Sequence, residues 1–309
     1  MNKIFKTLDE QIAILKDKGM VIDDEFFAKE VLLRENYFFL NGYRMLFMKS
    51  PTDKTFVLGA NFREFYGVFN FDRQIRNILF KNLLILENNL KSIISYHLSR
   101  TYGIKEADYL NPNNFNREIE KKRQVNDLIN KMKRQIRMNA DSHTATAHYQ
   151  NNYGYIPLWI AVKVLSFGIV GELFIILKPN DQREIANIFQ VDSDELEMYL
   201  PILSNFRNLC AHEEILFDHR VQRKINDTRF HSHLEIPKLN NEYIYGKNDL
   251  FCLIIILKQL LRKADFKMML KEMDYEIQKL DGKLESISIG KVLDRMGFPS
   301  NYLEMEGIN

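Results

Sequence analysis

Residues 75–94, IRNILFKNLLILENNLKSII, carry the strongest helix pattern in the chain. Apolar side chains recur there every three or four positions, which is the spacing that gathers side chains on one face of an α-helix. The pattern continues outward over residues 61–102, so we predict one or two long amphipathic helices in this region. Within it Glu87 and Lys91 stand four residues apart, in the order that favours an ion pair on a helix surface.

Helix patterns on both sides of this stretch predict a mainly α protein. We expect an N-terminal helical lobe over residues 1–58, a helical core over 59–220 with a basic insertion around 117–152, and a C-terminal helical extension over 221–309. Two finer predictions follow from turn-forming residues. The Asn41-Gly42 pair suits a tight turn, which predicts a bend or a small strand pair near residues 36–58, and Pro201 suits the first turn of a new helix.

The composition is that of an ordinary globular protein. The 309 residues are 46% hydrophobic and 27% charged, and 43 basic side chains against 41 acidic ones give a net charge of +2. Any attraction for nucleic acid must therefore come from local clusters of charge. The two cysteines, Cys210 and Cys252, have no paired spacing, which argues against a disulfide framework or a thiolate zinc site.

Nothing in the sequence predicts a membrane span or a signal peptide. The most apolar run, Leu158–Leu177, contains Lys163 and Glu172, so we expect it to be one buried core helix. The N-terminus lacks the uninterrupted apolar stretch of a secretory signal. A cytoplasmic protein without a membrane partner is the expectation that follows.

The segment Phe206–Glu214, with the sequence FRNLCAHEE, combines residue types that suit RNA cleavage. RNA carries its own nucleophile, the 2′-hydroxyl, so a ribonuclease needs a base, positive charge for the phosphorane-like transition state, and an acid for the departing 5′ oxygen. Histidine is the residue type that exchanges protons near neutral pH, so His212 can move the protons, while Arg207 can match phosphate oxygens. Asn208, four residues before the histidine, could fix the imidazole tautomer.

This segment resembles the Arg-polar-x-x-x-His motif of HEPN ribonucleases, and the wider chain is similar to the Abi (abortive infection) proteins of bacteria, which defend against phage. The likeness covers roughly residues 8–300. Two positions depart from it: Lys163 stands where relatives often carry an acid, and Glu213-Glu214 replaces more basic residues after the motif. The further segments that carry the likeness are Phe71–Arg76, Glu87, His148-Tyr149, Pro157–Trp159, Ser166–Gly168 and Gly297–Pro299.

The resemblance implies an HEPN-like helical bundle, a homodimer, and metal-independent RNA cleavage by Arg207, Asn208 and His212. It also implies that Glu87, on the preceding long helix, holds Arg207 or Asn208. The other interpretation of Glu87 is an exposed surface pair with Lys91. No Gly-rich phosphate loop and no metal-ligand spacing occurs, so we expect neither a cofactor nor a metal.

Helix geometry independently favours two copies of the chain in one site. Arg207 and His212 are five residues apart, or about 140° around an ideal helix, so they share no face unless the helix begins or bends there. Each chain also supplies a single motif histidine, whereas the reaction needs both a base and an acid. A two-fold dimer would solve both problems.

A basic segment over residues 117–137 is the best candidate for gripping phosphates, because it carries eight basic and three acidic side chains. A charge run of this kind is also typical of a plain solvated helix face. Two alternatives to the nuclease therefore stay open: a non-catalytic module that holds a structured RNA, and an interaction protein that senses phage. A regulatory RNA or an antitoxin is a further possible partner. The candidate RNA-binding residues are Arg73, Arg76, Lys121, Lys122, Arg123, Lys131, Lys133, Arg134 and Arg137.

Overall fold

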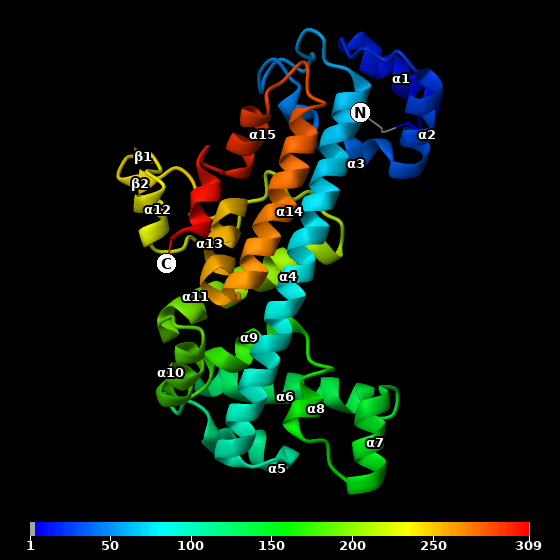
Figure 1. The fold of residues 1–309 in the computed structure, drawn as a ribbon. Coiled ribbons are helices and arrows are strands. Elements are labelled where there is room, and N and C mark those ends of the chain that lie inside the picture. Colours follow the sequence, from blue (N-terminus) through cyan, green and yellow to red (C-terminus); the bar gives the residue numbers. More distant parts are fainter. Residues whose placement is uncertain (1–3, 309) are drawn as a thin grey trace. The chain divides into compact units, whose positions relative to one another are not determined.

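The computed structural model describes residues 4–308, and over that range the protein is mainly α-helical (Figure 1). Fifteen α-helices, three short 3-10 helices and one two-stranded antiparallel sheet lie within it, which confirms the predicted fold class. The chain divides into two compact units. The first holds the described residues up to Phe80, Leu209–Ile255 and those from Lys263 onward, and the second holds Lys81–Asn208 and Ile256–Arg262. Both units combine segments distant in sequence, whereas the boundaries expected at residues 58 and 220 cut the chain linearly.

The long helix predicted over residues 61–102 is a single helix, α4 (Phe62–Tyr102), which contributes residues to both units. Its apolar stripe is buried: Leu79, Leu83, Leu86, Leu90 and Ile94 are each at most 2% exposed. Burying one such side chain stabilises a fold by about 1.5–3 kcal/mol. The periodic pattern in the sequence is therefore the core-facing side of α4.

The first unit surrounds the start of α4 with N-terminal and C-terminal helices. Of the two alternatives expected near residues 36–58, a bend or a small strand pair, no strand pair forms: the helix α3 occupies residues 37–41, and a single antiparallel bridge joins Met48 to Phe56. Gly42 keeps a right-handed conformation and serves close packing, since a Cβ there would collide with Ile215. The other elements are α1 (Leu8–Asp17), α2 (Glu25–Glu35), α3 (Tyr37–Asn41), η1 (Arg44–Leu46), α12 (Arg229–His233), β1 (Lys238–Leu239), β2 (Glu242–Tyr243), α13 (Leu250–Leu260), α14 (Lys263–Asp281), α15 (Ile289–Met296) and η3 (Tyr302–Glu306). The last five residues of α13 lie in the second unit.

The second unit corrects two finer predictions. The apolar run Leu158–Leu177 forms two helices and not one, because the Ser166 hydroxyl accepts the Ile169 N–H at 3.4 Å and starts a new helix there. Pro201 lies inside a helix and not in the first turn of one. Besides part of α4, the elements are α5 (Glu106–Tyr109), η2 (Pro112–Asn114), α6 (Lys122–Asn139), α7 (Thr144–Tyr153), α8 (Leu158–Ala161), α9 (Phe167–Ile175), α10 (Pro179–Ile188) and α11 (Ser193–Ala211), whose last residues lie in the first unit.

A search of residues 4–308 for helices able to cross a membrane finds none of sufficient length and apolarity.

Candidate functional site

Arg207, on α11, is held by an acid of α4 within the second unit. Its Nε lies 3.0 Å from Oε2 of Glu87, a residue 120 positions earlier in the chain. The other carboxylate oxygen of Glu87 accepts from Lys91 Nζ at 2.7 Å. The Glu87 side chain is only 6% exposed and that of Arg207 is 29% exposed. The pair with Lys91 therefore exists but is not a surface pair, and Glu87 orients a guanidinium that still reaches solvent.

His212 lies at the point where α11 ends. Glu213 adopts a left-handed conformation with φ of 55°, and the Glu214 N–H donates to the Leu209 carbonyl at 3.2 Å. Together these features form a Schellman-type helix end, with the histidine as the C-cap residue. Since the last helical residue is Ala211, the ideal helical relation between Arg207 and His212 no longer applies at the histidine.

Asn208 and His212 are both exposed. Across residues 4–308 the side chain of neither one makes a hydrogen bond or an ion pair with another residue. The expected bond from the Asn208 amide to the imidazole is therefore not formed in this conformation, and the histidine is accessible to a ligand.

The turn after His212 is fastened to α4 by a buried polar cluster within the first unit. Asp72 Oδ2 accepts from the Tyr43 hydroxyl at 2.7 Å, from Arg76 at 2.7 Å and from the Leu216 N–H at 3.1 Å. Arg76 in turn donates to the Glu214 carbonyl at 2.8 Å. Burial raises the pKa of Asp72 against the opposing effect of Arg76, and burial likewise raises the pKa of the Tyr43 hydroxyl.

Arg73 anchors the same turn less tightly. Its guanidinium binds both carboxylate oxygens of Glu35, at 3.0 and 2.7 Å, and lies 3.9 Å from the Glu213 carboxylate. The hydrogen bonds from Arg73 lower the pKa of Glu35. Arg76 has a side chain that is 3% exposed. Both arginines singled out as RNA-binding candidates thus have internal carboxylate partners, and Arg76 is closed to a ligand in this conformation.

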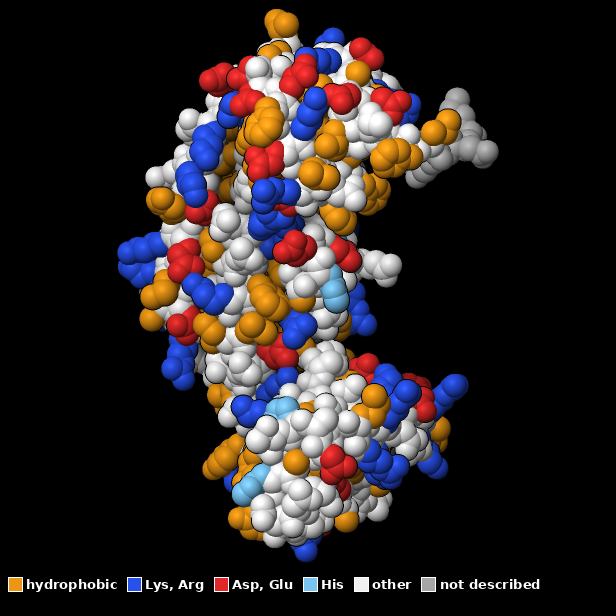
Figure 2. All heavy atoms as spheres, turned by 90° about the vertical axis from the view of Figure 1, so that its right-hand side faces the viewer, with side chains coloured by type: hydrophobic (Ala, Val, Ile, Leu, Met, Phe, Trp, Pro, Cys, Tyr) orange, Lys and Arg blue, Asp and Glu red, His pale blue; other side chains and the backbone are white. Residues whose placement is uncertain are grey.

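The basic segment forms α6 of the second unit, whose apolar side faces the core through Val125, Leu128, Ile129, Met132 and Ile136. Three cations of the basic segment have partners within the protein. Lys121 donates a hydrogen bond to the Ile175 carbonyl, and two ion pairs join Lys131 to Glu172 and, at 3.7 Å, Arg123 to Asp127. Basic and acidic side chains are interspersed over the face of the molecule shown in Figure 2. The candidates on this segment that are exposed are Lys122, Arg123, Lys131, Lys133, Arg134 and Arg137.

A second buried polar cluster in this unit was not predicted from the sequence. His97 Nε2 lies 2.7 Å from Asp181 Oδ1, and the Tyr102 hydroxyl donates to the other oxygen of that carboxylate at 2.6 Å. Burial raises the pKa of Tyr102. His97 and Tyr102 are each about eighty residues from Asp181 in the sequence, so no local spacing could have predicted the cluster. Within residues 4–308 no group of three or more His, Cys, Asp or Glu side chains is arranged to hold a metal ion.

The fold and this site define a mainly helical protein in which an Arg-Asn-x-x-x-His segment closes a helix and is braced by acids of one long helix. A family model described as Abi-like protein matches residues 30–218, which is more than half of the chain. The protein belongs to the Abi-like family. The match includes the motif, Glu87 and the Asp72 cluster. Comparisons with curated proteins and with solved structures give no match.

Proposed function

We propose that this Abi-like protein is a metal-independent endoribonuclease of the HEPN type that acts in abortive infection, the phage defence for which the family is named. The observation that supports the proposal most is the state of the motif: Arg207 is oriented by the buried Glu87, and His212 is exposed on a turn that is itself fastened. Oriented positive charge and an accessible imidazole are what cleavage of RNA by its own 2′-hydroxyl requires.

The reaction assigns one role to each motif residue. The imidazole of one His212 takes the proton from the 2′-hydroxyl, and the oxygen attacks the neighbouring phosphorus. The bond from phosphorus to the 5′ oxygen breaks, and a second, protonated His212 donates its proton to that oxygen. Arg207 neutralises the charge that builds up on the phosphoryl oxygens. The products are a 2′,3′-cyclic phosphate and a 5′-hydroxyl.

Two copies of the chain supply the acid and the base, so the active species in this proposal is a homodimer. RNA is the substrate, and the exposed cations of α6 add electrostatic attraction for its backbone. Unrestrained RNA cleavage would harm the cell, so an antitoxin or a regulatory RNA would keep the enzyme silent until infection.

The test measures cleavage of RNA by purified protein in the presence of a chelator. His212→Ala should abolish cleavage while leaving the melting temperature unchanged. Arg207→Ala should also abolish cleavage, but it should lower the melting temperature because the buried Glu87 carboxylate loses a partner. The wild-type products should carry 2′,3′-cyclic phosphate ends. His233→Ala is the matched control, because this histidine is also exposed and lies outside the motif. Full activity of His212→Ala would overturn the proposal, and salt-sensitive binding of RNA without turnover by the wild type would replace it with an RNA-binding role.

A further inference from the structure

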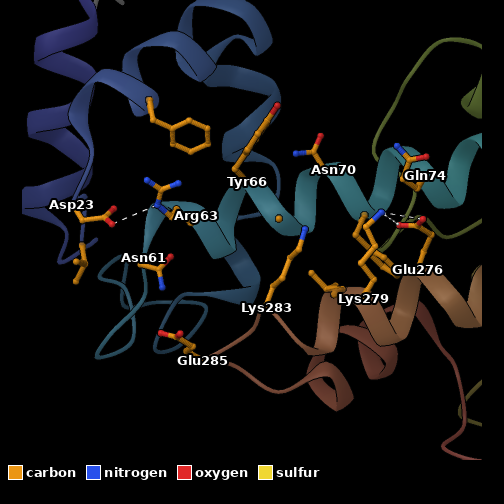
Figure 3. A pocket seen from close by; sticks show the side chains of 15 residues that line it. Asp23, Asn61, Arg63, Tyr66, Asn70, Gln74, Glu276, Lys279, Lys283 and Glu285 are labelled. Carbon is orange, nitrogen blue, oxygen red and sulfur yellow. Dashed lines mark hydrogen bonds and ion pairs between the residues drawn. The ribbon is translucent and has the colours of Figure 1, made fainter.

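An open groove of about 850 Å³ lies in the first unit, between the start of α4 and the end of α14 (Figure 3). Its volume falls within the range that small-molecule and cofactor sites occupy. One wall carries Arg63, Tyr66, Asn70 and Gln74, all from α4. The other wall consists of the end of α14 and the loop after it, and its lining residues are Glu276, Lys279, Leu280, Lys283 and Glu285.

The groove is preformed, because hydrogen bonds within the protein hold its two walls together. The buried Glu64 accepts the backbone N–H groups of Glu285 and Ser286, at 3.0 and 2.9 Å, and so ties the loop after α14 to the start of α4. Gly67 faces Leu280 across the groove floor, where a Cβ would come within 3.8 Å of that side chain. The hydrogen bonds to Glu64 hold the two walls together, which favours binding because little conformational entropy is lost when a ligand binds.

Polar side chains face the groove with unused hydrogen-bonding capacity. Asn70 and Gln74 are one helical turn apart, and within residues 4–308 neither side chain has a hydrogen-bond partner. Lys283 likewise makes no ion pair within that part of the chain. Figure 3 shows its side chain reaching from the lower wall toward α4, between Tyr66 and Asn70. Amide groups thus line one wall and an ammonium group approaches them from the other.

The other two cations of the groove have partners they can exchange. Arg63 lies 3.4 Å from Asp23 and 3.1 Å from Asp24, with about half of its side chain exposed. Lys279 pairs with Glu276 at 3.1 Å and is 45% exposed. Ion pairs at such exposed positions are weak, so a phosphate group can replace the carboxylates at little cost.

Two aromatic rings also line the groove, Phe27 from α2 and Tyr66 from α4. The ring of Tyr66 packs at 5.8 Å from that of Phe27, and the Arg63 guanidinium lies 4.9 Å above the Phe27 ring. Tyr66 is itself stacked on Phe69 and the Phe27 ring is covered by Arg63, so the half-exposed Arg63 guanidinium is the plane on which an unpaired base can stack. Amides that can read base edges, cations for phosphates and a guanidinium plane for stacking are therefore present in one concave site.

We propose that this groove binds single-stranded RNA, with base edges on Asn70 and Gln74 and phosphates on Lys279 and Lys283. The proposal deepens the proposed function, on which it rests for RNA as the substrate. Within the same unit Gln74 follows Arg73, whose guanidinium lies 3.9 Å from the carboxylate of Glu213, the residue after His212. Paired bases could not offer their edges to the amides, so the groove selects unpaired RNA.

The test measures binding of a short fluorescent oligoribonucleotide by anisotropy, in the full-length His212→Ala protein so that no cleavage intervenes. Lys283→Glu should weaken binding by about tenfold at low salt, because it replaces a phosphate-binding charge with a repelling one. The double substitution Asn70→Ala with Gln74→Ala should also weaken it, and should do so with no change in salt dependence. Lys271→Glu is the matched control, since this lysine is exposed on α14, the helix that precedes Lys283, but lies outside the groove.

The outcomes separate this proposal from the nuclease. If the groove variants bind the oligoribonucleotide as tightly as Lys271→Glu does, or if all proteins prefer the same RNA annealed to its complement, the groove proposal is overturned. If wild-type protein cleaves no RNA but the groove variants still lose binding, the groove stands and the nuclease falls. All substituted side chains are at least partly exposed, so unchanged melting temperatures are expected and serve as the check on folding.

Discussion

Two acid–base pairs on α4 have the same spacing and different partners. Asp72 and Arg76 lie in the first unit, Glu87 and Lys91 lie in the second, and each pair is four residues apart. The first acid holds the turn after His212, and the second holds Arg207 itself. Each unit therefore braces its own part of the motif through one carboxylate of the same helix.

The difference between the pairs is their degree of enclosure. The side chains of Asp72 and Arg76 are 1% and 3% exposed, while those of Glu87 and Lys91 are 6% and 12% exposed. Asp72 binds the backbone of the turn, whereas Glu87 binds a side chain that reaches solvent. We infer that the first pair is chiefly structural and that the second serves the reaction. Two predictions test this contrast, and a third tests the more exposed Arg73–Glu35 pair, which also anchors the turn after His212.

The largest expected effect is on stability, from Arg76→Ala. The substitution leaves the buried Asp72 carboxylate without its cation and the Glu214 carbonyl without its donor, so the free energy of unfolding should fall by about 3–5 kcal/mol. Urea unfolding followed by circular dichroism measures it. Arg123→Ala is the control, because that arginine also pairs at a four-residue spacing but is 93% exposed, and it should change stability by less than about 1 kcal/mol. Equal effects would contradict the assignment of a structural role to the Asp72 pair.

A smaller effect is expected on cleavage, from Glu87→Gln. Removing the charge loosens the orientation of Arg207, so the cleavage rate should fall by about tenfold, as for other supporting residues around a reactive group. The initial rate on an RNA substrate is the measurement. Glu184→Gln provides the comparison, because Glu184 pairs with the exposed Arg100 in the same unit. Should Glu87→Gln retain the full rate where Arg207→Ala has none, Glu87 has no part in the reaction.

The smallest effect concerns the pH dependence of stability. Arg73 lowers the pKa of Glu35 below its ordinary value of 4.5, so the ionised pair stabilises the fold above that pH and loses this effect as the pH falls through the lowered folded-state value. Wild-type protein should exceed Glu35→Gln in stability by about 1 kcal/mol at neutral pH. This difference in the free energy of unfolding should disappear at acidic pH, as measured by urea unfolding at a series of pH values. A gap that is constant with pH would show that the effect does not come from ionisation of Glu35.

Local pattern in the sequence determined a large part of this molecule. The apolar spacing of residues 61–102 predicted α4, and the spacing in 117–137 agrees with the amphipathic α6. These predictions succeeded because helix hydrogen bonds join residues four apart, and because one apolar face must be buried. The predictions for Pro201 and for the run Leu158–Leu177 were wrong, because a proline can lie within a helix and a serine can start a new helix in the middle of an apolar run.

Tertiary structure decided the partners of the polar side chains. The sequence marked Arg207, His212 and Glu87 as candidates, but only packing sets the 3.0 Å contact between residues 120 positions apart. Packing likewise encloses Arg76, which the sequence offers as a ligand for RNA, and it brings His97 to Asp181. A charged group shows the same letter in a sequence whether it is exposed or buried, and its effect depends on the surroundings that the fold provides.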